Sequence, residues 1–588
     1  MGILQTYRIK APRCARPKRT IFGLPEACDL TFPRLGESRT WRWHPSGKSG
    51  ETEHGLKTGV GSWQGRARDS LRSWPQIGLG TFRHPFLTLA VVAWTLFFPC
   101  LDAACGADRA GGSIEAALAS ITATELREHV SFLADPAFEG REAGSPAAQK
   151  AAHWLAEQLR QIGLTPAGVD GGFLQPFGQG MTNVLGLIPG SDAELAQQFI
   201  VVGAHFDHIG YGRKREGEPR VYPGADDNAS GVAGVLELAE ACSMVSLKRS
   251  VLVALWDGEE KGLLGSKHWA KSPTIPLQRI VISLNLDMVG RLRENSLQLV
   301  GVRSGGGWRR LFVLQNPGDL SLRFSWNLRP DSDHVTFFNV GVPSVMFHTG
   351  LHEDYHQPTD TAERINYEGA ERVVRYAFVV LHDLANREEL PKFRPEARDE
   401  KPPDEVARPL PRLGIECRPS SDTGPVEIVR VLEGFPAAEA GLQSGDRITK
   451  IAGQPLAAFE ELLKTVATAE EVIELTVEKA EGAESRQVRI PLRGKPAPFG
   501  LLLGLDPADP GVAVVLDVVP LSAGATAGLK RGDRIWEIDG QPLGNDPLTA
   551  VEEWARNWQK YSSRPSLRLT IEREGRVIHI DLAHPSRN

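Results

Sequence analysis

The sequence LWDGEEKGLLG, residues 255–265, places two adjacent glutamates directly after an apolar run. The run, residues 251–256, is typical of a buried strand, and Gly258 marks a turn after it. In such a turn Glu259 and Glu260 point in different directions, so one can bind a metal ion while the other transfers a proton. Most Glu-Glu pairs are solvated surface charges, so the interpretation depends on the segments around this one.

Strands and helices alternate on both sides of the glutamate pair. Helices are predicted at 231–243, 261–270 and 369–386, and an apolar stripe predicts another that ends at Gly163. Further strands are predicted at 183–189, 199–204, 280–286, 297–301 and 343–347. This alternation predicts an α/β domain at residues 113–390, a mixed sheet flanked by helices.

The composition is that of ordinary globular protein. The chain has 588 residues, which is too long for one core, with 41% hydrophobic and 24% charged residues. A net charge of -6 gives no indication of nucleic-acid binding. Residues 1–84 differ from the rest because they are irregular and basic, with 15 Lys and Arg against 6 Asp and Glu. This difference favours a true start downstream of them.

An apolar segment follows the basic one. It is PFLTLAVVAWTLFFPCL, residues 85–101, with small residues at 103–106. Its apolar centre is shorter than the roughly 20 residues that span a bilayer. Basic flank, apolar centre and small-residue exit resemble a secretory signal at 85–106, which predicts an exported protein. The alternative is a membrane anchor formed by residues 85–101.

The C-terminal part of the chain is a duplication. A Pro-rich, charged linker is predicted at 391–408. Beyond it, AGLQSGDRITKIAGQPL at 440–456 returns as AGLKRGDRIWEIDGQPL at 527–543. A repeat of this length that occurs twice indicates two copies of one small domain, predicted at 409–494 and 497–586.

Four more segments of the α/β domain carry potential metal ligands. They are His205-Phe206-Asp207 after a strand, PGADDNASG at 223–231, SLNLD at 283–287 and HEDYHQPTDT at 352–361. Each has a simpler explanation alone; for example, Asn228 or Ser230 can be a helix cap. Together they put four carboxylates and two histidines at strand ends of one sheet. That set suits two zinc ions that share a carboxylate.

These segments resemble the co-catalytic zinc aminopeptidase family, whose relatives include glutamate carboxypeptidase and glutaminyl cyclase. HFD, GADDNASG, DGEEKGLLGS, NLDMVGR and DYHQPTDT stand in family order over about residues 120–390. The resemblance implies two zinc ions, a cis peptide between Asp227 and Asn228, Asp207 orienting His205, and Glu259 as general base. It also implies the metal ligands, with Asp227 bridging both zincs, His205 and Asp287 completing one, and Glu260 and His356 the other.

The resemblance further implies removal of N-terminal residues from peptides by a water molecule held between the zincs. Two alternatives stay open. One is a carboxypeptidase of the same family, in which Arg291 or Arg293 binds a C-terminal carboxylate; the other is a binding scaffold without catalysis. From the same resemblance we expect Asp333, His334 and Tyr355 to line the substrate site.

Both repeats resemble PDZ domains, since each has a Gly-Asp-Arg-Ile strand start and a Gly-Gln-Pro-Leu turn. The resemblance implies a loop whose backbone N–H groups receive a peptide C-terminus. Modules that only orient the catalytic domain are the alternative. The predicted loops are Leu413-Gly414-Ile415 and Phe499-Gly500-Leu501.

Overall fold

The α/β domain is built on one mixed sheet of nine strands, in the order β1-β3-β7-β4-β8-β11-β9-β10 with β2 paired to β3. β7, β4, β8 and β11 are mutually parallel, whereas β3 and β9 run antiparallel to their neighbours β7 and β11. The computed structural model describes residues 112–212, 220–326, 328, 331–400, 412–419, 424–479, 485–561 and 564–583.

The strands are short, and the central ones are almost entirely buried. In chain order the sheet consists of β1 Thr165–Pro166, β2 Leu174–Phe177, β3 Met181–Ile188, β4 Phe199–His205, β7 Ser250–Trp256, β8 Ile280–Leu286, β9 Ser296–Val300, β10 Ser321–Phe324 and β11 Ser344–His348. The helices of this domain are α1 Ile114–Ser120, α2 Ala123–Leu133, α3 Pro146–Ile162, α4 Gly231–Ser243, α5 Leu264–Lys271, α6 Trp308–Leu314, α7 His334–Asn339 and α8 Tyr367–Asn386.

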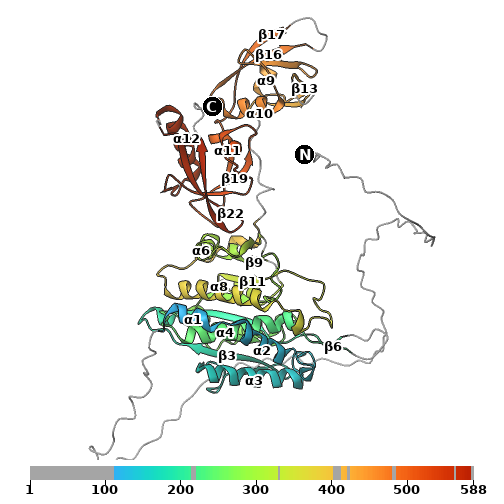
Figure 1. Ribbon diagram of the computed structural model, residues 1–588, viewed down its shortest axis with the longest axis vertical. Helices are drawn as coiled ribbons and strands as arrows, with labels where there is room; N and C mark the ends of the chain where they lie inside the picture. Colours follow the sequence, from blue (N-terminus) through green and yellow to red (C-terminus); the bar gives the residue numbers. More distant parts are fainter. Residues whose placement is uncertain are drawn as a thin grey trace, which may run out of the picture. The chain divides into compact units, whose positions relative to one another are not determined.

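Alternate residues of the central strands feed two separate cores, as the two-residue period of a strand requires. Ile200, Val202 and Ala204 of β4 pack with α1–α4 and α8 on one face. Val201 packs on the other face with Trp269 of α5 and Phe337 of α7. Helices therefore cover both faces of the sheet (Figure 1), which confirms the predicted fold class.

One predicted helix begins later than expected. The helix predicted at 261–270 starts at Leu264. Gly258 and Gly262 take positive φ angles of 79° and 101°, and the segment between β7 and α5 forms turns. Glu259 and Glu260 lie in these turns, before the helix begins. The short helices α1 and α2 were not predicted from the sequence.

The two repeats fold alike. The first contains β12 Ile415–Pro419, β13 Val426–Val431, β14 Arg447–Ile451, β15 Gln454–Pro455, β16 Val472–Glu478, β17 Ser485–Pro491, α9 Pro436–Glu439 and α10 Phe459–Thr468. The second contains β18 Leu501–Leu505, β19 Ala513–Val518, β20 Arg534–Ile538, β21 Gln541–Pro542, β22 Ser566–Arg573, β23 Arg576–Ala583, α11 Ala523–Thr526 and α12 Pro547–Tyr561. Their six-stranded sheets have the same order, β12-β13-β14-β16-β17 with β15 paired to β14, and β18-β19-β20-β22-β23 with β21 paired to β20. Each has its own apolar core.

Among the helices of the described residues, none is both long and apolar enough to cross a bilayer. The predicted basic segment and the predicted signal or anchor at 85–106 lie outside the described residues.

Candidate metal centre

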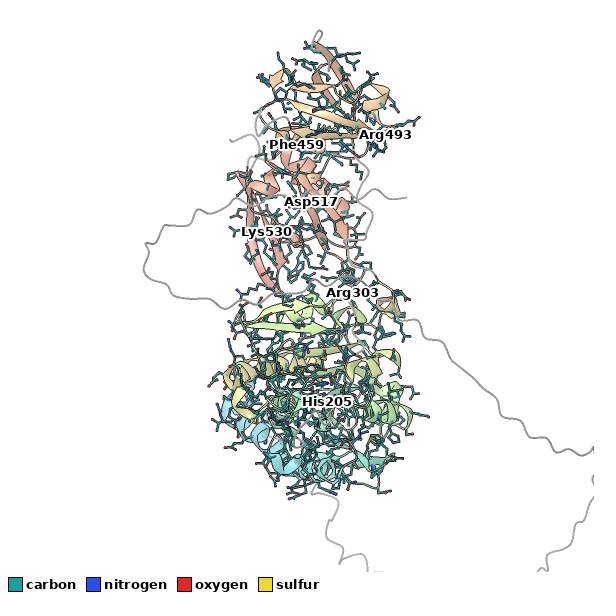
Figure 2. All side chains as sticks on the ribbon, turned by 90° about the vertical axis from the view of Figure 1, so that its right-hand side faces the viewer. His205, Arg303, Phe459, Arg493, Asp517 and Lys530 are labelled. Carbon is teal, nitrogen blue, oxygen red and sulfur yellow. The ribbon has the colours of Figure 1, made fainter. Side chains whose placement is uncertain are left out.

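The potential ligands meet where the parallel strands of the α/β domain end. β4 ends at His205, β7 leads into Glu259 and Glu260, and β8 leads into Asp287. His356 follows β11 by a short loop. Since the carboxyl ends of parallel strands lie at one edge of a sheet, residues 150 positions apart become neighbours there. His205 lies inside this domain (Figure 2).

Three side chains form one potential cation position. Nε2 of His205 lies 3.4 Å from Oδ1 of Asp227 and 3.5 Å from Oδ1 of Asp287. All three side chains are buried. One imidazole nitrogen and two carboxylate oxygens that converge in this way are a typical zinc ligand set.

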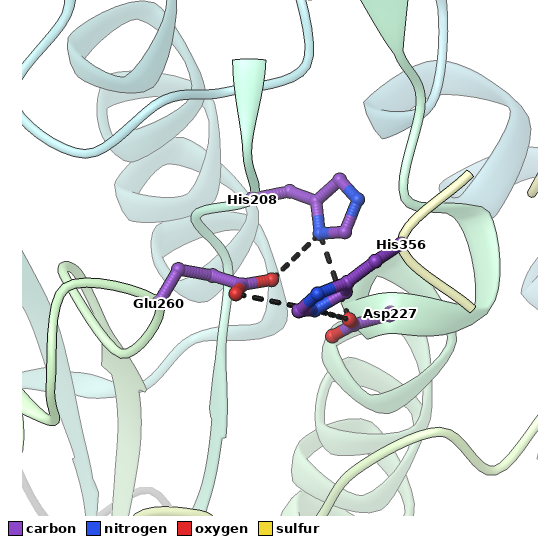
Figure 3. A group of neighbouring side chains, drawn as sticks. All are labelled: His208, Asp227, Glu260 and His356. Atoms are coloured by element: carbon purple, nitrogen blue, oxygen red, sulfur yellow. Dashed lines mark hydrogen bonds and ion pairs between the residues drawn. The ribbon is translucent and has the colours of Figure 1, made fainter. Parts of the chain in front are cut away.

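A second group adjoins the first through Asp227. Nε2 of His356 lies 3.0 Å from Oδ2 of Asp227 and 3.3 Å from Oε2 of Glu260. His208 joins this group, with its Nδ1 2.8 Å from Oε1 of Glu260 (Figure 3). Asp227 thus presents one oxygen to each group, as a carboxylate shared by two cations does. His208 was not predicted from the sequence as a ligand.

The electrostatics of both groups fit divalent cations. Burial lowers the pKa of His356, but hydrogen bonds to Asp227 and Glu260 outweigh it and raise the pKa to about 10. Burial also lowers the pKa of His205, but the carboxylates of Glu259 and Asp287 raise it well above its ordinary value. Protons on the imidazoles thus supply the positive charge that the crowded carboxylates need. Two dications would supply that charge and leave the imidazoles free as ligands.

The affinity for zinc is therefore expected to fall as the pH is lowered. Because the raised pKa of His356 keeps its proton on the metal-free ring below about pH 10, zinc must displace that proton and the one on His205. Each position contains one of these histidines, so the release of one proton per zinc predicts a loss of about 10-fold in the apparent affinity of each position, and about 100-fold for the pair, for each pH unit from 8 to 6. Chelator competition at several pH values measures this slope; an affinity that stays constant over the window would contradict it.

Asp207 holds the glutamate pair in place. Its carboxylate accepts the backbone N–H of Glu259 at 3.0 Å and that of Glu260 at 3.3 Å. Asp207, the residue expected to orient His205, also lies beside that ring: Nδ1 of His205 is 3.2 Å from the backbone oxygen of Asp207 and 3.8 Å from its carboxylate.

The loop that carries Asp227 is fixed by buried hydrogen bonds. The carboxylate of Asp360 accepts the backbone N–H groups of Asp226 and Asp227. Asn228 accepts the N–H of Gly231, in the first turn of α4, and donates to the carbonyl of Leu286. The Asp227–Asn228 peptide is cis. These contacts tie the segment that carries Asp227 to the end of β8 and to the loop beyond β11.

Arg141 joins two of the ligand-bearing segments. It was not predicted from the sequence because its partners are backbone atoms. Its guanidinium is fully buried and donates to the carbonyls of Phe206 (2.8 Å) and Pro223 (2.7 Å). It also donates to the carbonyls of Leu133 (2.6 Å) and Gly224 (2.9 Å). Arg141 thereby fixes the distance between the His205 segment and the Asp227 segment.

Arg141→Met should therefore destabilise the protein. Four buried carbonyls would lose their donor, and each unsatisfied group costs about 1–3 kcal/mol, so we expect a loss of at least about 3 kcal/mol. Urea denaturation measures it. Arg160→Met is the control, since Arg160 lies exposed beside Glu157 on α3 and its loss should change nothing measurable. Equal midpoints for both variants would contradict the role of Arg141.

A cavity of about 170 Å³ opens onto both cation positions. Glu259, Tyr355 and His348 line it together with the ligands. Tyr355 stacks on the His356 ring with centroids 3.9 Å apart. Burial raises the pKa of Glu259 well above its ordinary value. Asp333 and His334, the other predicted substrate residues, are buried and are not among the lining residues. Asp333 accepts a hydrogen bond from Ser266 at 2.5 Å.

Each predicted peptide-binding loop makes backbone hydrogen bonds within its own repeat. In the first repeat Gly414 has φ +80° and its carbonyl accepts the N–H of Leu432, and β12 starts at Ile415. In the second repeat the N–H of Gly500 donates to Ala497 and that of Leu501 to Pro498. The loop of the second repeat therefore already uses two of its donors.

A mixed α/β sheet with imidazoles and carboxylates clustered at the ends of its parallel strands defines a metal-binding domain with two adjoining cation positions. Comparison with known families agrees with this class. Residues 183–381 match the model of peptidase family M28, and residues 406–478 and 487–572 match that of the PDZ domain. A match to the peptidase family M28 model is thus followed by two matches to the PDZ model, which confirms both resemblances.

Individual relatives are more distant. The aminopeptidase YwaD of Bacillus subtilis is 28% identical over 203 residues, 33% of this chain and 42% of the relative. The probable lipoprotein aminopeptidase LpqL of Mycobacterium tuberculosis is 29% identical over 205 residues, 28% of this chain and 39% of the relative. The chain thus spans less than half of either relative. The solved structure of a zinc aminopeptidase from Bacillus subtilis matches 46% of this chain and 96% of its own, at 18% identity and a TM-score of 0.38.

Proposed function

We propose that residues 113–390 form an exported aminopeptidase that holds two zinc ions and removes N-terminal residues from peptides. The observation that carries this proposal is the cavity. Its lining combines the two cation positions with Glu259 and contains several acidic side chains. Among the described residues that line it there is no Lys or Arg. Such a cavity suits a substrate with a free α-ammonium group better than one with a free carboxylate.

Zinc would be held by His205, Asp227 and Asp287 at one position and by Asp227, Glu260 and His356 at the other; when bound, it supplies Lewis acidity and acidifies a water molecule. Glu259 then takes a proton at the cavity wall and returns it to the leaving amine. Asp207 fixes both glutamates through their backbone N–H groups. The stacked Tyr355 and His356 rings form one wall against which the substrate lies.

The arginines that a carboxypeptidase would need are engaged elsewhere. Arg291 pairs with Asp354 at 2.8 Å, and Arg293 donates to the backbone oxygens of Gly350 and Leu351. Neither lines the cavity. These contacts favour the aminopeptidase over the carboxypeptidase.

Hydrolysis of a leucyl anilide by the purified protein, with and without chelator, tests the proposal. We expect zinc-dependent turnover of leucyl anilide and none of its N-acetylated form, because acetylation removes the ammonium group. Equal turnover of the two substrates would contradict the aminopeptidase. Turnover of neither, by protein that contains zinc, would favour the binding scaffold.

Two further parts of the proposal concern localisation and partners. Residues 85–106 act as the export signal, or residues 85–101 remain as an anchor; the lipoprotein name of one relative agrees with export. The PDZ domains bind protein C-termini through the loops at 413–415 and 499–501.

A further inference from the structure

His208 lies beside one cation position only. Its Nδ1 is 2.8 Å from Oε1 of Glu260 and 3.7 Å from Oδ2 of Asp227. In Figure 3 this nitrogen points toward the carboxylates of both residues. The nitrogen atom of His208, the imidazole of His356 and the carboxylates of Asp227 and Glu260 offer four ligand atoms that all lie within 4.8 Å of one another.

The separations of these atoms match a tetrahedron around zinc. Zinc bonds to nitrogen and oxygen are about 2.0–2.1 Å long, which puts neighbouring ligand atoms about 3.3 Å apart. The two separations made by His356 are 3.0 and 3.3 Å, and the two made by His208 are 2.8 and 3.7 Å. Both histidines face the same oxygen of Asp227, Oδ2, whereas His356 pairs with Oε2 of Glu260 and His208 with Oε1. All four separations lie within about 0.5 Å of the tetrahedral edge.

The ring of His208 is held in this orientation by packing. Its side chain is fully buried, and its backbone N–H donates to the carbonyl of Arg141. Gly224, at φ +58°, lies so close that a Cβ there would be 2.5 Å from Cγ of the ring. Nε2 of His208 has no hydrogen-bond partner among the described residues, so the polar contacts of the ring are all made by Nδ1.

We propose that Nδ1 of His208 is a fourth protein ligand of the cation held by Asp227, Glu260 and His356. This inference rests on the proposed zinc enzyme. The position then has four protein ligands, the closed coordination of a structural zinc. The other position would be held by three protein ligands, His205, Asp227 and Asp287, and zinc there would keep an open coordination site for water or substrate.

Stepwise zinc titration of the intact protein against a chelator of known affinity tests this assignment. We expect His208→Ala to weaken one of the two zinc sites more than about 100-fold, which exceeds the 10–100-fold effect of an outer hydrogen-bonding partner. The other site should keep its affinity. His208→Asn is the matched variant: its amide can donate to Glu260 where Nδ1 lies but is a poor zinc ligand, so it should not restore the affinity.

X-ray absorption of the zinc-loaded native protein gives a second measurement that needs no variant. We expect three imidazole ligands for each pair of zinc ions; two would overturn the assignment. A loss of affinity within 100-fold, or its restoration by His208→Asn, would overturn it as well. Native protein that binds no zinc would instead overturn the proposed function, and with it this inference.

Discussion

The Glu259→Gln variant is expected to hydrolyse leucyl anilide about 10²- to 10⁴-fold more slowly than the native protein while it keeps both zinc ions. A general acid–base group contributes about that factor to turnover. Glutamine has nearly the same shape but cannot take a proton, and Glu259 lies in the cavity wall outside both ligand groups. The loss should therefore appear in kcat, with zinc content unchanged by elemental analysis.

The neighbouring glutamate provides the matched control. Glu260→Gln should lose zinc from the His356 position, since its carboxylate lies 3.3 Å from Nε2 of His356 and 2.8 Å from Nδ1 of His208. The two variants change adjacent residues of the same turn. The first is expected to lose turnover and keep its zinc, and the second is expected to lose zinc. Near-normal turnover by Glu259→Gln would remove the assigned base, and zinc loss by that variant would reverse the two roles.

Asp227→Ala is expected to lose both zinc ions and, with them, all measurable turnover. Its Oδ1 lies 3.4 Å from Nε2 of His205, and its Oδ2 lies 3.0 Å from Nε2 of His356. Removal of this carboxylate therefore leaves each position one ligand short and removes a negative charge between the two cations. Elemental analysis after dialysis should give close to no zinc per chain.

Asp287→Ala is the comparison for Asp227→Ala. Among the predicted ligands, Asp287 forms an ion pair only with His205, whose Nε2 lies 3.5 Å from its Oδ1. The loss of Asp287 should therefore empty one position and leave the second zinc in place. The loss of both zinc ions would identify a carboxylate shared by the two positions, whereas the loss of one would identify a ligand of a single position. Retention of even one zinc by Asp227→Ala would contradict the bridging assignment. Circular dichroism of the metal-free variants checks that both remain folded.

The sequence allowed most of the central sheet to be predicted because its strands are continuous apolar runs. β4 and β7 are buried at every position, as parallel strands covered on both faces are. The repeats were predictable for another reason, because the sequence is duplicated. β14 and β20 occupy equivalent positions in the two copies. Helix α5 was misplaced because the turn before it is held by a distant group, the carboxylate of Asp207.

The potential ligands were predictable because each stands directly after a strand or in a motif. His208 was not, since nothing in the sequence distinguishes it from a packed histidine next to Asp207. Arg141 was not, because its four acceptors are carbonyls from three separate segments. Contacts of this kind depend on how loops meet in space, and no local pattern of residue types encodes them.

Diffraction from zinc-loaded crystals at the zinc absorption edge would show whether the site holds a pair of cations. We expect two anomalous peaks about 3.5–4 Å apart on either side of the Asp227 carboxylate. One would adjoin His205 and Asp287, and the other Glu260 and His356. A fully loaded protein with one peak there, or with none, would rule out the pair.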